Sequence, residues 1–318
     1  MARKPESEIT RLDDAARAGW LYYIAGNTQD EIAGKLGISR QTAQRLVSLA
    51  VSARLIKVRL DHPISACMEL ADRLKEKFEL AFCEVVPTDP AAVSSTLGIA
   101  EACAGEIERR LSGAAPVVLA MGSGRTLRAA VEQLPTMDCP QHKLVSLVGN
   151  IATDGSASFY DVIVRMADAV RAPHYPMPVP VIASTRQERD LLREQKPVSN
   201  VIALARKAHI AFVGVAQIDE HAPLLLDGFV TRDEIRALRK SGAIGEIVGW
   251  AYDQNGELIR GLTNDRVASV EIGHTARRPI IGVSMGDAKV AAISAALRGK
   301  LIDGLITSER TAGQLLKR

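Results

Sequence analysis

Residues 117–134 read VVLAMGSGRTLRAAVEQL, and this stretch indicates the fold of most of the chain. The apolar run Val117–Met121 predicts a buried strand, and Thr126–Leu134 predicts an amphipathic helix. The glycines between them predict a tight turn from the strand into the helix. A buried strand followed at once by a helix is the unit from which α/β folds with a parallel sheet are built.

The same alternation of short apolar runs and helical stretches continues on both sides of this unit. The expected strands are Phe82–Val86, Val117–Met121, Leu144–Val148, Val179–Ala183, Ile210–Val215, Ile280–Ser284 and Leu305–Thr307. The expected helices are Met68–Phe78, Ala91–Ser112, Thr126–Leu134, Asp161–Val170, Ser199–Ala208, Arg232–Ser241 and Asp287–Leu297. This order predicts a doubly wound, mostly parallel α/β sheet, in which ligands bind at the carboxyl ends of the strands.

The N-terminal fifth of the chain differs from the rest in charge. Of the 40 Lys and Arg residues, ten lie in residues 1–60, where only six of the 37 Asp and Glu residues occur. Between Ser39 and Leu60 there are five bases and no acid. Such a patch is typical of a surface that binds DNA phosphates, and a solvated basic helix face is the alternative.

Residues 28–47, TQDEIAGKLGISRQTAQRLV, predict two helices joined by a tight turn. Thr28 and Glu31 have the spacing of a capping box at the start of the first helix. Gly37 stands where the turn needs a positive φ, and Ser39 can cap the second helix.

The second of these helices runs from Ser39 to about Ala53 and has two opposite faces. Its apolar stripe consists of Ala43, Leu46, Val47 and Ala50. Its polar face, about 200° away, consists of Gln41, Gln44, Arg45 and Ser48. With a preceding helix over Leu12–Ala25, the pattern predicts a helix-turn-helix DNA-binding domain.

Within this domain, we expect Gln41, Gln44 and Arg45 to read base edges in the major groove. Arg40 and Thr42 lie near the start of the helix and are expected to contact DNA phosphates. A helical hairpin that serves only for dimerisation is the alternative interpretation.

A domain boundary is expected soon after this helix. The alternating segment Arg54–Leu60 predicts a short strand, a wing beside the recognition helix. His62-Pro63-Ile64 then interrupts the strand pattern. We therefore expect a DNA-binding domain over residues 1–60 and a second, larger domain over residues 61–318.

The turn Gly122-Ser123-Gly124-Arg125-Thr126 predicts an anion-binding site. Glycines let the backbone approach an anion closely, and the N-terminus of the following helix presents unpaired N–H groups. The stretch lacks the Gly-Lys-Ser/Thr of a Walker A loop and the third glycine of a dinucleotide fingerprint, so a single phosphate is the expected guest. The alternative is that the glycines serve only the geometry of the turn.

A second junction of this kind adds further candidates for a ligand site. Gly286 can open the turn after the strand near residue 283, and Lys289 can reach back to an anion from the helix that follows. Asp154, Asp161 and Glu246 can accept hydrogen bonds from ligand hydroxyls. The alternatives are an exposed lysine and three solvated acids.

Other classes of protein do not fit the sequence. No apolar run approaches the roughly 20 residues that a membrane span needs, and the charged N-terminus lacks the apolar core of a secretory signal. Cys67, Cys83, Cys103 and Cys139 form no Cys-x-x-Cys pair, and the six histidines have no zinc spacing. We therefore expect a cytoplasmic protein with no membrane association, no bound metal and no cofactor.

The whole chain resembles the SorC family of bacterial sugar-responsive transcription regulators. Besides residues 28–47, the resemblance rests on AMGSGRTLRAAV at 120–131, GAIGEIVGWAYDQNGELI at 242–259 and GVSMGDAKVAAISAALRGKLIDGLITSE at 282–309. It implies an N-terminal helix-turn-helix domain and, over residues 61–318, a Rossmann-like effector-binding and oligomerisation domain similar to phosphosugar isomerases. It also implies a phosphorylated sugar or related effector and a homo-oligomer, usually a tetramer.

The resemblance carries site residues with it. It places the phosphate-binding turn at Gly122–Thr126, where Arg125 stands in a run that often carries hydroxyl residues. It implies effector contacts at Lys289, Glu246 and Asp161. Arg125 therefore implies either a stronger charge contact or a changed ligand.

Taken together, these features predict a DNA-binding transcription regulator of a sugar or polyol utilisation operon, and not an enzyme. Its binding to operator DNA is expected to respond to a phosphorylated sugar or polyol. One alternative is a phosphosugar isomerase or deaminase with an added DNA-binding domain, for which Asp219-Glu220-His221 is the evident acid–base cluster. Another is a DNA-binding protein whose larger domain only oligomerises.

We expect Arg45→Ala to weaken operator binding by about 1–3 kcal/mol and to relax the preference at one base position, because a base-reading contact is lost. A mobility-shift titration against operator variants measures both effects. Unchanged affinity together with unchanged base preference would remove Arg45 from the residues that read bases.

Overall fold

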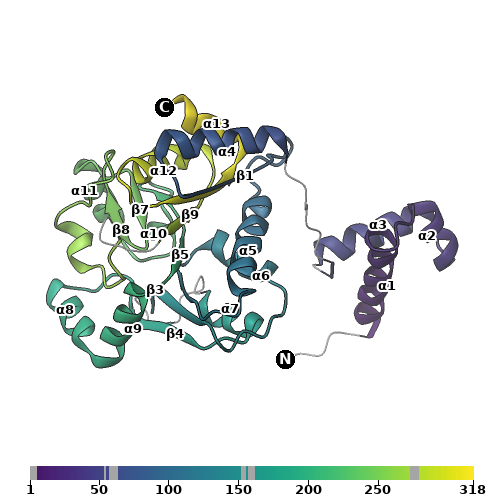
Figure 1. Cartoon of the computed structure of the whole chain (residues 1–318), viewed down its shortest axis with the longest axis horizontal. Helices are drawn as coiled ribbons and strands as arrows, with labels where there is room; N and C mark the ends of the chain where they lie inside the picture. Colours follow the sequence, from purple (N-terminus) through teal and green to yellow (C-terminus); the bar gives the residue numbers. More distant parts are fainter. Residues whose placement is uncertain (1–5, 54, 57–63, 152–154, 157–161, 273–278) are drawn as a thin grey trace. The chain divides into compact units, whose positions relative to one another are not determined.

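The structure is a computed structural model that describes residues 6–53, 55–56, 64–151, 155–156, 162–272 and 279–318. The chain divides into two compact units, residues 1–62 and 63–318 (Figure 1). Among the helices of these described residues, none has the length and apolar character needed to cross a membrane.

The smaller unit contains three helices within its described residues, α1 (Glu6–Tyr23), α2 (Gln29–Leu36) and α3 (Arg40–Ser52). The backbone N–H of Thr28 donates to Glu31 Oε2 at 2.7 Å, and the N–H of Glu31 donates to Thr28 Oγ1 at 3.3 Å. These reciprocal bonds confirm the capping box at the start of α2.

The turn into α3 also has the predicted geometry. Gly37 ends α2 with φ at 66°, and Ser39 Oγ accepts a hydrogen bond from the Thr42 N–H at 3.1 Å. A small core of buried side chains joins the three helices: Ala18, Ile32, Ala43 and Val47. The predicted wing strand, Arg54–Leu60, lies mostly outside the described residues.

A seven-stranded sheet runs through the described residues of the larger unit, and every pair of neighbouring strands is parallel. Its spatial order is β1-β10-β9-β5-β2-β3-β4. The strands are β1 (Phe82–Val86), β2 (Val118–Met121), β3 (Lys143–Ile151), β4 (His174–Pro180), β5 (Ile210–Val213), β9 (Ile280–Val283) and β10 (Gly304–Ser308). The predicted fold class, a doubly wound parallel α/β sheet, is confirmed.

Helices cover both faces of this sheet (Figure 1). One apolar core lies under α5 (Leu97–Leu111), α6 (Arg125–Gln133) and α7 (Ile163–Val170). The other lies under α4 (Ser65–Phe78), α9 (Lys196–Arg206), α12 (Val290–Arg298) and α13 (Glu309–Lys317). Alternate strand residues enter the two cores, with Leu119 in the first and Ala120 in the second.

The strand order reverses between β2 and β5. The chain leaves β2 toward β3 and β4, and then returns to β5 on the opposite side of β2. Such a reversal is a topological switch point, where a crevice opens at the carboxyl ends of the strands. The turns that follow β2 and β5 therefore start side by side at that edge.

A small antiparallel sheet lies beyond this edge and was not predicted. It consists of β6 (Ala216–Gln217), β7 (Gly245–Ile247) and β8 (Trp250–Tyr252). The side chain of Asn264 extends it, since its Oδ1 accepts from the Ala251 N–H at 2.9 Å and its Nδ2 donates to Ala251 O at 2.8 Å. Strands of two or three residues are too short to produce a readable alternation.

Several predicted boundaries were wrong for identifiable reasons. The fourth strand is His174–Pro180 and not Val179–Ala183. It contains three prolines, which argue against a strand in general but are tolerated here because β4 is at the edge of the sheet. Similarly, α5 begins at Leu97 and not Ala91, because a loop follows β1.

Other elements complete the larger unit. They are the helices α8 (Arg186–Glu194), α10 (Pro223–Leu226) and α11 (Arg232–Lys240), and the 3₁₀ helices η1 (Leu262–Arg266) and η2 (Asp287–Lys289). The prediction missed α8, which has no fully buried residue and so lacks a clear apolar stripe. It also missed α10, a single turn.

We expect Gly245→Ala to destabilise the larger unit by about 1–3 kcal/mol, because overpacking of a closed core forces neighbouring atoms apart. A Cβ on Gly245 would overlap the Tyr252 hydroxyl and lie 2.7 Å from the Ala292 Cβ. Gly113→Ala is the control, because a Cβ there meets no heavy atom within 4 Å. Equal urea midpoints for both variants would contradict the close packing of β7.

Candidate functional site

The turn after β2 is tightly packed. The Gly122 N–H donates to Phe212 O of β5 at 2.8 Å, and a Cβ on Gly122 would lie 3.3 Å from Val248 Cγ1. Gly124 precedes α6 with φ at 126° and ψ at 167°, a conformation that is open almost only to glycine. The sequence prediction of a glycine-dependent turn from strand to helix is therefore confirmed.

The turn after β9 repeats this backbone geometry. Gly286 has φ at 114° and ψ at 146°, and its N–H donates to Thr311 Oγ1 of α13 at 3.0 Å. The chain then forms η2, which ends at Lys289. Gly286 thus shapes the junction, while Lys289 is the residue that lines the neighbouring cavity.

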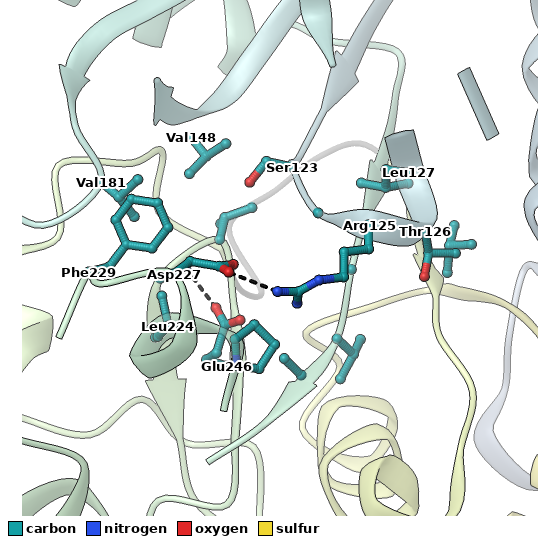
Figure 2. Close-up of a pocket in the computed structure, with 18 of the residues that line it drawn as sticks. Ser123, Arg125, Thr126, Leu127, Val148, Val181, Leu224, Asp227, Phe229 and Glu246 are labelled. Carbon is teal, nitrogen blue, oxygen red and sulfur yellow. Dashed lines mark hydrogen bonds and ion pairs between the residues drawn. The ribbon is translucent and has the colours of Figure 1, made fainter. Parts of the chain in front are cut away.

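A cavity of about 130 Å³ lies where the two junctions meet the small sheet. Of the predicted effector residues, it is lined by Ser123, Gly124, Arg125, Thr126, Glu246 and Lys289. Figure 2 labels Ser123, Arg125, Thr126 and Glu246 of this set. The Arg125 side chain points across the cavity toward Asp227, which lies near Glu246. Residues from distant parts of the sequence therefore meet at the carboxyl edge of the sheet.

Glu246 is the buried acid of the cavity. It lies on β7, between Ala216 of β6 and Ala251 of β8, and its Oε2 accepts a hydrogen bond from the Gly249 N–H at 2.8 Å. Burial raises the pKa of Glu246 to about 7, although the Gly249 N–H and Lys289 favour the ionised form. Asp227 raises this pKa further by repulsion.

The hairpin turn beside Glu246 is unusual for its residue type. Val248 and Gly249 join β7 to β8 with φ at 46° and 91°, as in a two-residue hairpin turn with both central residues left-handed. A β-branched residue seldom adopts a positive φ, and such strain tends to occur at functional sites. Val248 also lines the cavity, so the turn sets the shape of its wall.

Among the described residues, the cations that line the cavity are Arg125 and Lys289. Lys289 is half-buried, and burial lowers the pKa of its ammonium, while the charge of Glu246 acts to raise it. The Arg125 guanidinium pairs with Asp227 at 2.8 Å. Burial raises the pKa of Asp227, and the charge of Arg125 opposes that shift.

Sequence reasoning missed several residues that line the cavity. Asp227 was missed, because it follows the single-turn helix α10 and has no motif around it. An apolar wall was missed as well, because its members come from separate elements: Val148, Val181, Leu224, Phe229 and Val248. Only the three-dimensional arrangement joins them, so no signal in the sequence could have found them.

The remaining predicted residues lie elsewhere. Asp161 and Asp154 are outside the described residues. The Asp219-Glu220-His221 cluster forms a turn at the surface, in which the His221 N–H donates to Asp219 Oδ1 at 2.8 Å, and none of the three lines the cavity. Among the described residues, no group of three or more His, Cys, Asp or Glu side chains is arranged to hold a metal ion.

The smaller unit presents the predicted polar face of α3 to solvent. Gln41, Gln44 and Arg45 are exposed, whereas Ala43 and Val47 on the opposite face are buried.

Two residues at the start of α3 also have partners within the unit. The Arg40 guanidinium is 3.5 Å from Asp30, and both side chains remain about two-thirds exposed (69% and 68%). The Thr42 hydroxyl lies 2.8 Å from the Ser39 hydroxyl. A surface ion pair of this kind contributes little to stability, so Arg40 can exchange Asp30 for another anion at small cost.

We expect Glu246→Gln to remove a pH-dependent loss of stability. Because the pKa of Glu246 is raised in the folded protein, its protonated carboxyl group stabilises the fold fully at pH values below the ordinary pKa of 4.5. This contribution is lost as the pH rises through about 7. Between pH 5 and pH 8, the free energy of unfolding of the wild-type protein should therefore fall by up to about 3 kcal/mol relative to that of the variant.

Urea unfolding at both pH values measures this difference, with exposed Glu220→Gln as the control. Parallel stability–pH curves for Glu246→Gln and the wild-type protein would show that Glu246 is ionised at low cost.

Comparisons with known proteins agree with this architecture. A family model described as "Putative sugar-binding domain" matches residues 62–317. The erythritol catabolism regulatory protein EryD of Brucella abortus is 32% identical over 302 residues, which cover 95% of this chain and 96% of that protein. The transcriptional regulator LsrR of Klebsiella pneumoniae is 30% identical over 313 residues, covering 95% of this chain and 92% of that protein.

A solved structure has the same fold over nearly the whole length. The full-length sorbitol operon regulator SorC from Klebsiella pneumoniae matches 99% of this chain and 100% of that chain with a TM-score of 0.73, at 22% identity. The chain therefore belongs to the sugar-binding domain family, within the SorC-like transcription regulators that its sequence resembles.

Proposed function

We propose that this protein is a DNA-binding transcription regulator of a sugar or polyol utilisation operon, and that a phosphorylated sugar or polyol modulates its binding to operator DNA. The observation that carries this proposal is the cavity at the switch point. It combines a glycine turn, Arg125 and Lys289 with the buried carboxyl group of Glu246.

The chemistry of the cavity supports a ligand with an anionic end and several hydroxyl groups. The turn Ser123–Thr126 offers backbone N–H groups and two hydroxyls at the start of α6, beside Arg125, and these groups suit a phosphoryl oxygen. Glu246 can accept hydrogen bonds from ligand hydroxyls. The apolar wall around Phe229 and Leu224 suits the carbon faces of a sugar or polyol chain.

The smaller unit supports the DNA-binding half of the proposal. Its α3 carries an exposed polar face with Gln41, Gln44 and Arg45, whose side chains match the edges of adenine and guanine. Arg40 and Thr42 are proposed to contact DNA phosphates. The relatives EryD and LsrR are named as regulators, which favours this function for the present chain.

Regulation requires that the effector bind one arrangement of the protein better than another. We propose a homotetramer in the cytoplasm, in which the spacing of the helix-turn-helix units matches the operator half-sites. We further propose that the cavity binds without catalysis. The acid–base cluster Asp219-Glu220-His221, which the enzyme alternative needs, does not line it.

We expect a phosphorylated sugar or polyol to raise the melting temperature of the full chain and to change its affinity for operator DNA. At a concentration of 100 times Kd, the ligand stabilises the protein by about 2.7 kcal/mol. Lys289→Ala should abolish most of this stabilisation, whereas Lys240→Ala, at the exposed end of α11, should keep it.

A thermal-shift screen followed by mobility-shift titration measures both effects. If no phosphorylated sugar or polyol in the screen changes either the melting temperature or the operator affinity, the effector half of the proposal is wrong.

A further inference from the structure

The ion pair between Arg125 and Asp227 joins two separate elements across the cavity. Arg125 is the first residue of α6, and Asp227 directly follows α10 (Figure 2). The guanidinium and the carboxylate are 2.8 Å apart, and their side chains are 51% and 17% exposed. The carboxylate is therefore mostly withdrawn from water, while about half of the Arg125 side chain remains exposed.

Asp227 belongs to a short segment, residues 223–229, that folds on itself. The backbone N–H of Asp227 donates to Pro223 O at 2.8 Å, and the N–H of Phe229 donates to Leu224 O at 2.9 Å. Leu224, Asp227 and Phe229 all line the cavity. The pair with Arg125 thus connects a locally closed segment to the anion-binding turn.

The position of Asp227 places it in competition with an anionic ligand. A phosphoryl group on the turn at Gly124 would lie beside Arg125, where Asp227 already supplies the negative charge. Arg125 pairs well with one oxyanion group in its planar fork, and a second anion at the same place is repelled. Glu246 adds another carboxyl group to the same cavity, so a phosphate entering with Asp227 in place meets two acidic side chains.

We propose that Asp227 is an internal competitor for the anionic end of the effector, and that a phosphoryl group takes Arg125 from Asp227 and releases segment 223–229. This inference rests on the proposed function, because it assumes that the cavity binds a phosphorylated ligand. It also deepens that function. An anionic ligand takes the place of Asp227 at Arg125, whereas a neutral polyol leaves the Arg125–Asp227 pair in place.

The exchange gives the site two consequences. The affinity for phosphate is lower than the glycine turn, Arg125 and Lys289 would provide without Asp227, because Asp227 must be displaced first. In addition, binding is coupled to a segment that lines the cavity, so that segment can adopt one arrangement with Asp227 paired and another with Asp227 released.

The test compares the full chain with Asp227→Asn, which keeps the size of the side chain and removes its charge. Titration calorimetry with inorganic phosphate should give a Kd for Asp227→Asn that is about tenfold lower than the Kd of the wild-type protein. Binding of glycerol, the neutral probe, should be unchanged. Glu220→Gln removes a negative charge outside the cavity and should leave both affinities at wild-type values.

A double variant separates competition for Arg125 from simple repulsion. If Asp227 acts by occupying Arg125, the gain from Asp227→Asn disappears when Arg125 is replaced by Ala. If it acts only by its charge in the cavity, the gain persists in the Arg125→Ala background, and the proposed exchange is wrong.

Hydrogen exchange adds a readout of the released segment. Phosphate should increase amide exchange at residues 224–229 in the wild-type protein, and Asp227→Asn should show the faster exchange without phosphate. If both proteins bind phosphate, and Asp227→Asn matches the wild-type protein in affinity and in amide exchange, the competitor role is wrong and the proposed function is unaffected. If neither phosphate nor any phosphorylated sugar binds to either protein, both proposals are wrong.

Discussion

Parallel pairing of β2 with β5 is the constraint on which the site depends. Leu119 to Met121 pair in register with Ile210 to Phe212, and the Gly122 N–H extends this ladder by one bond to Phe212 O. Because both strands end at the same edge and the strand order reverses between them, the turns after them diverge and leave a crevice. The glycine turn, the small sheet and the α10 segment all face that crevice.

Charge balance is the second requirement of the site. Within the part of the chain that the structure describes, two cations and two carboxyl groups line a small cavity, and each is partly withdrawn from water. Isolated charges in such a place are costly, so each needs a partner or a shifted pKa. Arg125 and Asp227 satisfy one another as an ion pair, whereas burial moves the pKa of Glu246 upward and that of Lys289 downward. We therefore expect a ligand that enters the cavity to rearrange these partnerships.

The sequence was most informative where one local pattern has a single structural solution. The capping box of Thr28 and Glu31, the positive φ of Gly37 and the exposure of Arg45 each follow from residues within a few positions of one another. The strand-to-helix turn around Gly124 is of the same kind. In contrast, the sequence offered Lys289 and Glu246 only as separate candidates, and the family resemblance implied that they contact the effector. Their place in one cavity with that turn appears only in the structure.

By itself, the sequence determined the alternation of strands and helices, the helix-turn-helix caps and the glycine junctions, because periodicity and backbone freedom are properties of neighbouring residues. Only the tertiary structure decided the strand order, the edge strand that tolerates three prolines and the small sheet that carries Glu246. It also decided that Asp227 meets Arg125, across 102 positions of sequence. Such contacts depend on how separate elements pack, and no local pattern of residues encodes that packing.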